Sequence, residues 1–166
     1  MEKFSGEEIV IRALRREDNA AMANVIRSTL KEFGADRPGT VYFDPTTDDL
    51  FRLFQEEGSF YQVAVAGDTI VGGGGIFPSA GLPEGTCELV KMYLLSPARG
   101  IGLGKKIITA CLEEARRLGY QQVYLETMPE LKDALKTYEK FGFTYLTGPL
   151  GNTGNFGCAL WMLKKL

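Results

Sequence analysis

The sequence contains no histidine among its 166 residues. Catalytic pairs in which an imidazole activates a serine or a cysteine are therefore excluded, and so are most zinc sites, because histidine is a common ligand of that metal. Any acid–base chemistry must use glutamate, aspartate, tyrosine, lysine, cysteine or water. We expect no metal site and look for carboxyl and phenol groups as catalysts.

Long apolar runs are also missing, since no segment approaches the roughly 18 consecutive apolar residues of a membrane span. The opening residues MEKFSGEEIV lack the positive and then apolar layout of a secretory signal. The net charge is -2, whereas binding to a nucleic-acid backbone requires a basic surface. We therefore expect a cytoplasmic protein that binds neither membranes nor nucleic acid.

Cysteine is scarce. Cys87, Cys111 and Cys158 lie far apart in apolar stretches, so we expect small core residues and no disulfide framework. The rest of the composition, with 45% hydrophobic and 24% charged residues, is ordinary for a globular protein. A chain of this length is expected to form one domain over residues 1–166.

Apolar periodicity predicts an alternation of strands and helices. Strands are predicted within residues 7–14, 60–77 (a hairpin that turns at residues 66–68), 87–95, 121–126, 143–148 and 158–166. Helices are predicted over residues 16–33, 47–58, 103–118 and 129–142, and residues 34–47 form a long loop. The alternation in the second half favours a mixed α/β sheet with parallel pairing at its centre.

A glycine-rich stretch, ARGIGLGKK at residues 98–106, lies between a predicted strand and a predicted helix. Backbone N–H groups at a helix N-terminus are unpaired, and the helix dipole favours an anion there. Glycines allow successive amides to face one concavity that a phosphate can approach, with added charge from Arg99 and from Lys105 or Lys106. The alternative is a glycine-rich connection that packs closely and binds nothing.

The spacing of these glycines fits neither the dinucleotide fingerprint G-x-G-x-x-G nor the P-loop. A second glycine run, VGGGGIF at residues 71–77, has no helix after it and no basic neighbour. It predicts a strand that is bulged or closely approached by another segment.

Two segments resemble the GCN5-related N-acetyltransferases (GNAT). In residues 87–108, CELVKMYLLSPARGIGLGKKII, a strand leads into Arg99-Gly100-Ile101-Gly102-Leu103-Gly104, which matches the family's Arg/Gln-x-x-Gly-x-Gly/Ala loop. In residues 134–143, ALKTYEKFGF, the positions Tyr138, Gly142 and Phe143 match its second motif. The order of predicted elements is also similar over nearly the whole chain.

The resemblance implies an α/β fold with a mixed central sheet of about seven strands and about four helices, whose central parallel pairing flanks the cofactor site. It implies one acyl-CoA N-acyltransferase domain that moves an acetyl group from acetyl-CoA to a primary amine of a small molecule or peptide. The amine would attack directly in a ternary complex. The implied cofactor-binding residues are Met92, Tyr93, Leu94, Arg99, Gly100, Ile101, Gly102, Leu103, Gly104 and Lys105.

By the same resemblance, the pantetheine arm of the cofactor pairs with strand backbone, and the Met92 amide polarises the thioester carbonyl. Tyr138 is the implied general acid for the departing thiolate, although its place on an apolar helix stripe also fits a core role. Leu131 departs from the family pattern, because many members have a cofactor-binding asparagine at this position.

Glu88 is the predicted general base. It matches the acidic base of several family members, and the two-residue period of a strand places it on the same face as Met92. Glu126, near the end of the next strand, and water are alternatives for this role. Either carboxylate could instead be an ordinary solvated group at a strand end.

Two other functions stay open, a non-catalytic module that binds coenzyme A and a nucleotide-phosphate-binding protein of another class. We expect residues 34–47 and 148–157 to frame the acceptor pocket. They offer Asp36, Tyr42, Phe43, Asp44, Asn155 and Phe156. Two copies of the chain could pair through their terminal strands as a homodimer.

Overall fold

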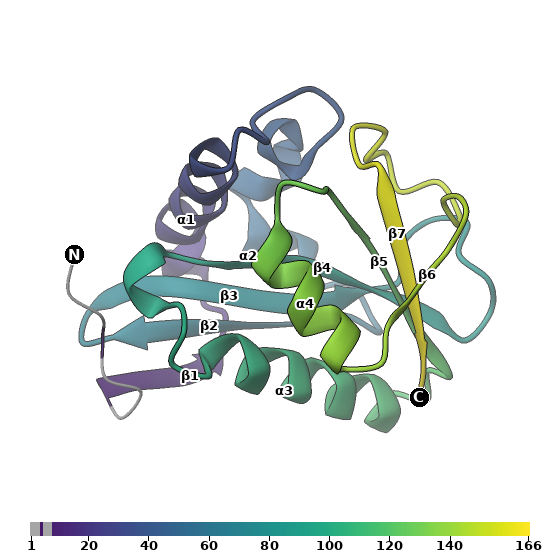
Figure 1. Ribbon diagram of the computed structural model, residues 1–166. Helices are drawn as coiled ribbons and strands as arrows, with labels where there is room; N and C mark the ends of the chain where they lie inside the picture. Colours follow the sequence, from purple (N-terminus) through teal and green to yellow (C-terminus); the bar gives the residue numbers. More distant parts are fainter. Residues whose placement is uncertain (1–3, 5–7) are drawn as a thin grey trace.

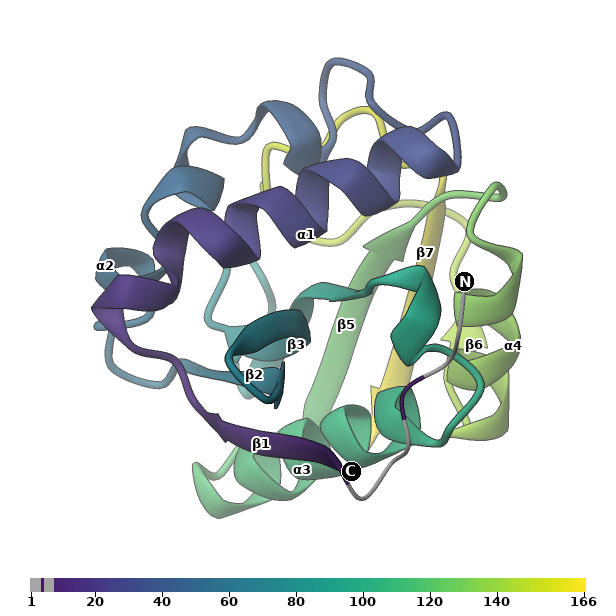
Figure 2. The same ribbon diagram turned by 90° about the vertical axis from the view of Figure 1, so that its left-hand side faces the viewer.

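Helices cover both faces of one mixed sheet in the computed structural model, which describes residue 4 and residues 8–166 (Figures 1 and 2). The strands are β1 (Ile9–Ala13), β2 (Phe60–Ala66), β3 (Thr69–Phe77), β4 (Thr86–Leu94), β5 (Gln122–Thr127), β6 (Thr144–Tyr145) and β7 (Leu160–Lys165). The α-helices are α1 (Asn19–Glu32), α2 (Leu50–Leu53), α3 (Leu103–Arg117) and α4 (Lys132–Lys140). Short 3-10 turns are η2 (Arg16–Asp18), η3 (Val41–Phe43), η4 (Pro45–Asp48) and η5 (Ser96–Ala98).

The strands of the described residues lie in the order β1-β2-β3-β4-β5-β7-β6. Strands β1 to β4 pair antiparallel in sequence order, β4 and β5 pair parallel, and β7 pairs antiparallel with both β5 and β6. The predicted mixed sheet with parallel pairing at its centre is confirmed. Of the two terminal strands, β1 lies at a sheet edge and β7 lies inside the sheet. Pairing between two copies of the chain through these strands stays a prediction.

The helices divide the core into two clusters. Figure 2 shows α1 on one side of the sheet and α3 on the other. The α3 face buries side chains at helical spacing, namely Leu103, Ile107, Ile108, Cys111, Leu112 and Ala115. The α1 face buries Met22, Val25, Ile26, Thr29 and Leu30. All three cysteines are buried and free, as predicted.

The glycine run of residues 72–75 lies inside β3, and register shifts occur on both sides of this strand. A Cβ added at Gly74 would lie 2.7 Å from Met92 Sδ and 3.0 Å from Ile107 Cγ2. The prediction of a bulged, closely approached strand is therefore confirmed, and α3 packs against β3 because this position has no side chain.

Two helix predictions are wrong in extent. The helix predicted over residues 47–58 is reduced to Leu50–Leu53, because Asp44 and Asp49 each cap a separate short turn with their side chains. The helix predicted from Pro129 begins at Lys132 instead. Met128 is buried in the α1-side cluster and accepts a hydrogen bond from the Leu131 amide, which holds this segment in a turn.

The last two strands also differ from their predicted ranges, since β6 contains two residues and β7 begins at Leu160.

Within residue 4 and residues 8–166, no helix has the length and apolar character needed to cross a membrane.

Candidate active site

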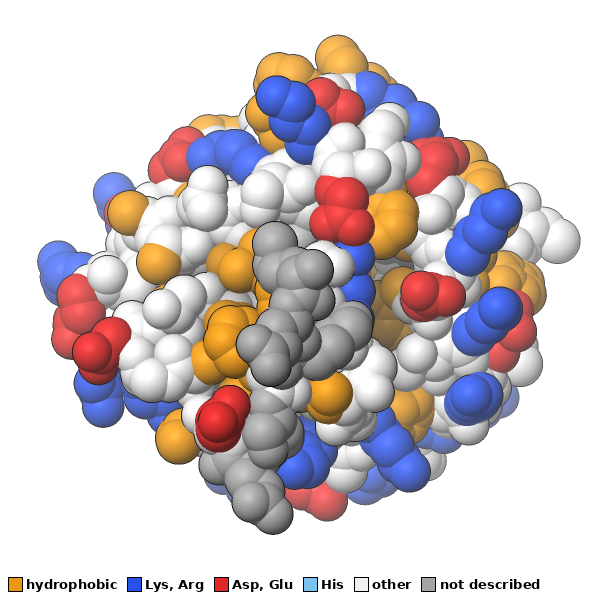
Figure 3. All heavy atoms as spheres, turned by 60° about the vertical axis from the view of Figure 1, so that its left-hand side comes forward, with side chains coloured by type: hydrophobic (Ala, Val, Ile, Leu, Met, Phe, Trp, Pro, Cys, Tyr) orange, Lys and Arg blue, Asp and Glu red, His pale blue; other side chains and the backbone are white. Residues whose placement is uncertain are grey.

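A cleft opens where two parallel strands separate. Strands β4 and β5 pair over residues 86–88 and 122–124 and then diverge, as Figure 1 shows. The cleft has a volume of about 910 Å³ and is lined by both strands, the start of α3 and one side of α4. In Figure 3, a hollow with hydrophobic side chains in its floor lies near the centre of the view, and Lys and Arg side chains are spread over the right-hand side of the molecule.

Ten of the twelve predicted site residues line this cleft. They are Glu88, Met92, Tyr93, Leu94, Arg99, Gly100, Gly102, Gly104, Lys105 and Tyr138. The other two, Ile101 and Leu103, face a separate small hollow beside β1. The structure therefore brings the two sequence motifs together on one cavity, although about 40 residues separate them along the chain.

The glycine loop forms the end of the cleft at α3. Gly100 and Gly102 have φ values of +76° and +82°, which a residue with a side chain rarely adopts. Gly102 is the N-cap of α3 and no side chain caps the helix. The first-turn amides, which no residue of the described chain caps, are therefore available to an anion.

The side chain of Arg99 is bound to residues at the end of α1, so its guanidinium is not free above the glycine loop. Its guanidinium pairs with both carboxylate oxygens of Glu32 at 2.7 and 2.9 Å and lies 4.9 Å from the ring centroid of Phe33. Its Nε also donates to the Leu94 carbonyl at 2.9 Å. These contacts fix the position of the loop relative to α1 and β4.

A bulge interrupts β4 in the wall of the cleft. Gly73 is opposite Tyr93 and Gly75 is opposite Val90, so Lys91 and Met92 have no register partner in β3, and β5 has already diverged. Lys91 has a φ of 52°, the one positive value outside glycine in the described residues. The Met92 backbone is thus free of regular pairing with either neighbouring strand.

The bulge overturns the prediction that Glu88 and Met92 share a face. Cys87 and Leu89 pack in the same core cluster as Met92 and Leu94. The alternation of side chains between the two faces of β4 therefore shifts by one residue between Leu89 and Met92. The side chain of Glu88 points to the opposite face, where Ser79 donates a hydrogen bond to it.

Glu88 is 4% exposed and lines the acceptor end of the cleft. Burial raises the pKa of this carboxyl to about 8; the hydrogen bond from Ser79 and the charge of Lys91 oppose the rise, and the charges of Glu126 and Asp44 add to it. Ser79 Oγ contacts Oε1 at 2.5 Å, whereas Oε2 has no hydrogen-bond partner among the described residues. Glu88 therefore has one free oxygen and a pKa close to neutral pH.

Glu126, the alternative base, also lines the cleft but both of its oxygens are occupied. Tyr124 donates to Oε2 at 2.6 Å, and Thr153 donates to Oε1. A carboxylate with both oxygens engaged by hydroxyl donors is less suited to take up a proton. The geometry favours Glu88.

Tyr138 lies between the core and the cleft. It is 7% exposed and packs edge-on against Phe143 with ring centroids 5.9 Å apart. Its hydroxyl makes no hydrogen bond to any other described residue, although Tyr138 lines the cleft. Burial raises the pKa of this phenol well above its ordinary value, which keeps the hydroxyl protonated.

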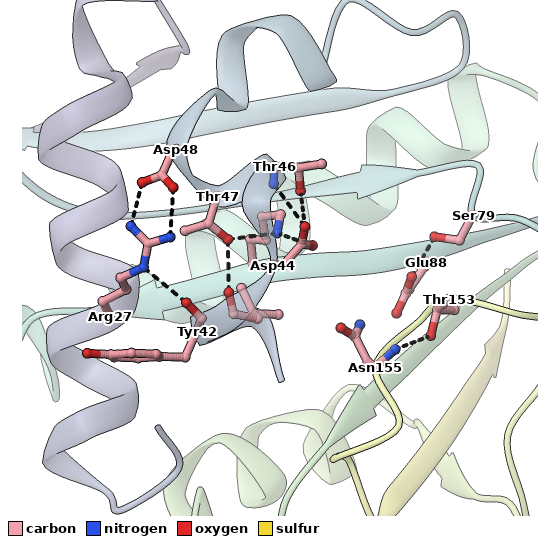
Figure 4. Close-up of polar contacts among 12 residues, drawn as sticks. Arg27, Tyr42, Asp44, Thr46, Thr47, Asp48, Ser79, Glu88, Thr153 and Asn155 are labelled. Carbon is pink, nitrogen blue, oxygen red and sulfur yellow. Dashed lines mark hydrogen bonds and ion pairs between the residues drawn. The ribbon is translucent and has the colours of Figure 1, made fainter. Parts of the chain in front are cut away.

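The two predicted acceptor loops do meet. The Gly157 amide donates to the Gly39 carbonyl at 2.8 Å. Arg37 of the first loop also pairs with Glu130, which precedes α4, at 2.9 Å. Asp44 and Asn155 line the cleft, and Figure 4 shows both side chains. The other acceptor candidates, Asp36, Tyr42, Phe43 and Phe156, are not part of its lining.

Sequence reasoning missed three side chains at this end. Ser79 and Thr153 donate to the two glutamates, and Lys91 Nζ forms an ion pair with Asp44 at 3.1 Å. A lysine in the middle of a predicted central strand was the available signal, since lysine is rarely buried unless it is paired. Ser79 and Thr153 lie in loops and have no such signal.

Known proteins match the chain in sequence and in fold. The model of the acetyltransferase (GNAT) family matches residues 23–143. The N-acetyltransferase YjgM of Escherichia coli (strain K12) is 40% identical over 168 residues, which cover 100% of both chains. The structure of a GNAT-family acetyltransferase from Staphylococcus aureus Mu50 has a TM-score of 0.82 at 20% identity and covers 95% of this chain and 98% of its own.

A further match in fold is the acetyltransferase yncA from Salmonella typhimurium, whose structure includes its cofactor acetyl-CoA. It has a TM-score of 0.73 at 20% identity, over 95% of this chain and 94% of its own.

Proposed function

The chain belongs to the GNAT family of acetyltransferases, and from that premise we propose that it acetylates a primary amine of a small molecule or peptide by direct attack in a ternary complex. The enzyme class is an acetyl-CoA-dependent N-acetyltransferase. The proposal concerns three points: the class of acceptor, the direct attack of the amine on the thioester, and the roles of individual residues.

The donors that line the cleft fit acetyl-CoA. A pyrophosphate needs several N–H groups and nearby positive charge, and the uncapped start of α3 offers both through its amides and the exposed Lys105. An extended pantetheine arm needs unpaired strand backbone, and β4 offers it beyond Glu88 on the side from which β5 has diverged. Residues 92–94 and 99–105 would hold the two parts.

Acetyl-CoA supplies an acetyl thioester when it is bound. Met92 would donate its backbone N–H to the thioester carbonyl oxygen, where negative charge develops during attack. The bulge supports this role, because it leaves Met92 without a pairing partner in β3 or β5. A donor fixed in advance costs no reorganisation when charge develops.

Glu88 would accept the proton that an ammonium acceptor must lose before it attacks. A base is most effective when its pKa lies close to the working pH, and the pKa of Glu88 is raised to about 8. The acceptor or a water molecule would lie between Glu88 and the reacting centre, because the side chain of Glu88 and that of Met92 occupy opposite faces of β4.

Tyr138 would protonate the departing thiolate. Its hydroxyl reaches the same cleft and has no hydrogen-bond partner among the described residues, so it is available to a leaving group. Its raised pKa keeps the hydroxyl protonated until the thiolate forms, and burial in the same cleft makes that thiolate more basic than it would be in water.

The observation that carries the proposal is the position of Glu88 and Tyr138 on one cleft that also contains the glycine loop. We expect calorimetry to detect acetyl-CoA binding and a free-thiol assay to detect turnover in a panel of amino acids, alkylamines, diamines and peptides. Binding without thiol release from any amine would favour the non-catalytic module. No binding of acetyl-CoA would contradict the proposal as a whole.

A further inference from the structure

We propose that Lys91 is a positioning residue, which couples the acceptor segment to the β4 bulge and sets the charge balance around the catalytic base. The acceptor segment is defined here as residues 40–48. This inference rests on the proposed function, in which Glu88 is the base and the Met92 amide binds the thioester oxygen.

The side chain of Lys91 is buried and contacts two side chains of the acceptor segment. Lys91 is 7% exposed, and its Nζ lies 3.1 Å from Asp44 Oδ2 and 3.2 Å from Thr47 Oγ1. Figure 4 shows these two partners, Asp44 and Thr47. Thr47 is fully buried and donates its hydroxyl to the Val41 carbonyl at 3.0 Å. The cation is therefore tied to both short turns of the acceptor segment.

The backbone of Lys91 forms the bulge. A φ of 52° is unfavourable for a residue with a long side chain and persists where the surroundings hold it. Tyr61 of β2 reaches across the intervening strand β3 and donates its hydroxyl to the Lys91 carbonyl at 2.7 Å. One residue is thus held at its carbonyl by the sheet and at its ammonium by the acceptor segment, directly before Met92.

The charges around Glu88 come from three elements. Lys91 lies on the same strand, Asp44 on the acceptor segment and Glu126 on β5. The titratable groups of Tyr93, Tyr124, Cys87 and Cys158 also interact electrostatically with Glu88. Lys91 lowers the pKa of Glu88, and Asp44 and Glu126 raise it. Two partners in one ion pair therefore act on the base in opposite directions.

Each member of the pair favours the charged form of the other. Burial would raise the pKa of Asp44, but the charge of Lys91 and the hydrogen bonds from Thr46 outweigh it and the pKa is lowered. Burial lowers the pKa of Lys91, and the Asp44 carboxylate opposes that effect. Removal of one partner would leave the other as an uncompensated charge in a buried place.

Because Lys91 and Asp44 shift the pKa of Glu88 in opposite directions, the inference can be tested directly without an acceptor. Carbon-13 NMR of labelled glutamate carboxyls can follow the titration of Glu88, which is assigned by its loss in Glu88→Gln. We expect the midpoint near 8 in the wild type, a higher midpoint in Lys91→Met and a lower one in Asp44→Asn. A merely structural pair would leave the midpoint in place, or both variants would move it the same way.

Two further variants keep the test valid if a single substitution impairs folding. Lys91→Met combined with Asp44→Asn removes both charges, so folding should recover and the midpoint should return toward the wild-type value. Lys91→Arg keeps the charge and should also stay close to the wild type.

Arg37→Met is the matched control. It breaks another ion pair between this loop region and the rest of the protein, at 2.9 Å from Glu130, and neither partner lines the cleft. We expect no change in the Glu88 midpoint and no change in the Met92 amide resonance, whereas Lys91→Met should move both.

The inference is overturned if Lys91→Met and Asp44→Asn fail to move the midpoint in opposite directions. Failure of the proposed function looks different: acetyl-CoA would not bind, or Glu88→Gln would keep full activity, and the opposite shifts could still be present. The two claims are therefore tested separately.

Discussion

The two ends of the cleft are built from different parts of the chain. The proposed cofactor end is made by backbone groups of residues 99–105, and two positive φ values shape it. The proposed acceptor end is made by side chains from separate segments, such as Asp44, Ser79, Glu88 and Thr153. A site of the first kind depends on local sequence, whereas one of the second kind depends on how distant segments pack.

Their electrostatics differ as well. Near the acceptor end, cations are already paired, since Lys91 contacts Asp44, Arg27 contacts Asp48 and Arg37 contacts Glu130. At the proposed cofactor end, Arg99 is paired with Glu32, but Lys105 is exposed and forms no ion pair within the described residues. An unpaired positive charge is thus available where the proposed diphosphate lies, whereas the cations near the proposed amine site are neutralised by carboxylates. This difference favours one orientation of the cofactor in the cleft.

The largest effect is expected at the acceptor end, from Glu88→Gln. Loss of a positioned base should lower kcat by about 10²–10⁴-fold. In the wild type the rate should rise with pH through about 8, because the active form of a base is the deprotonated carboxylate. This limb should disappear in the variant. The measurement is kcat against pH with an amine that the thiol-release panel identifies.

Glu126→Gln sharpens this comparison of two neighbouring carboxylates. The structure leaves one oxygen free in Glu88 and none in Glu126, so Glu126→Gln should preserve the pH limb. If the limb were lost in Glu126→Gln and kept in Glu88→Gln, the assignment of the base would be reversed.

Next in size is Tyr138→Phe, which tests the group that faces the leaving thiolate. We expect kcat to fall by roughly 10²–10³-fold through loss of the acid. Stability should change by less than about 0.5 kcal/mol, because the hydroxyl has no partner among the described residues to lose.

Tyr145→Phe is the control for that variant. Its hydroxyl donates to Glu139 at 2.6 Å on the surface, and Tyr145 does not line the cleft, so kcat should not change. Equal kcat values for Tyr138→Phe and the wild type would limit Tyr138 to a core role.

The same contrast explains what the sequence could predict. Residues 99–105 could be interpreted directly, because glycine positions and a following helix are local features. The order of elements and the parallel pair followed from periodicity. The bulge at Lys91 could not be predicted, since its φ depends on Tyr61 and Asp44, which are 30 and 47 positions away. With the bulge unseen, the face of Glu88 relative to Met92 was wrong.

Residues 44–58 show the same limit. Apolar spacing favours a helix over residues 47–58, but the caps at Asp44 and Asp49 divide this part of the chain into short turns. Arg27 on α1 fixes those turns by pairing with Asp48 and donating to the Tyr42 carbonyl at 3.0 Å. A contact between segments this far apart overrides a weak local preference.

The smallest expected effect concerns the cofactor end and compares the two ends of α3. Gly102 and Gly119 have φ values of +82° and +88°, and a Cβ at either would meet nothing within 4 Å. Substitution by alanine should therefore cost each position about 1–2 kcal/mol through backbone strain alone. At Gly102 this strain should shift the amides that are proposed to bind the diphosphate.

We expect Gly102→Ala to weaken acetyl-CoA binding by roughly 5–30-fold, which corresponds to that energy, and Gly119→Ala to leave the Kd unchanged. Thermal unfolding should show a similar loss of stability in both variants, so the difference between them isolates the anion site. Calorimetry with acetyl-CoA measures it. Equal Kd values in the two variants would mean that the backbone at the start of α3 does not hold the cofactor, and the contrast between a backbone-built and a side-chain-built end would fail.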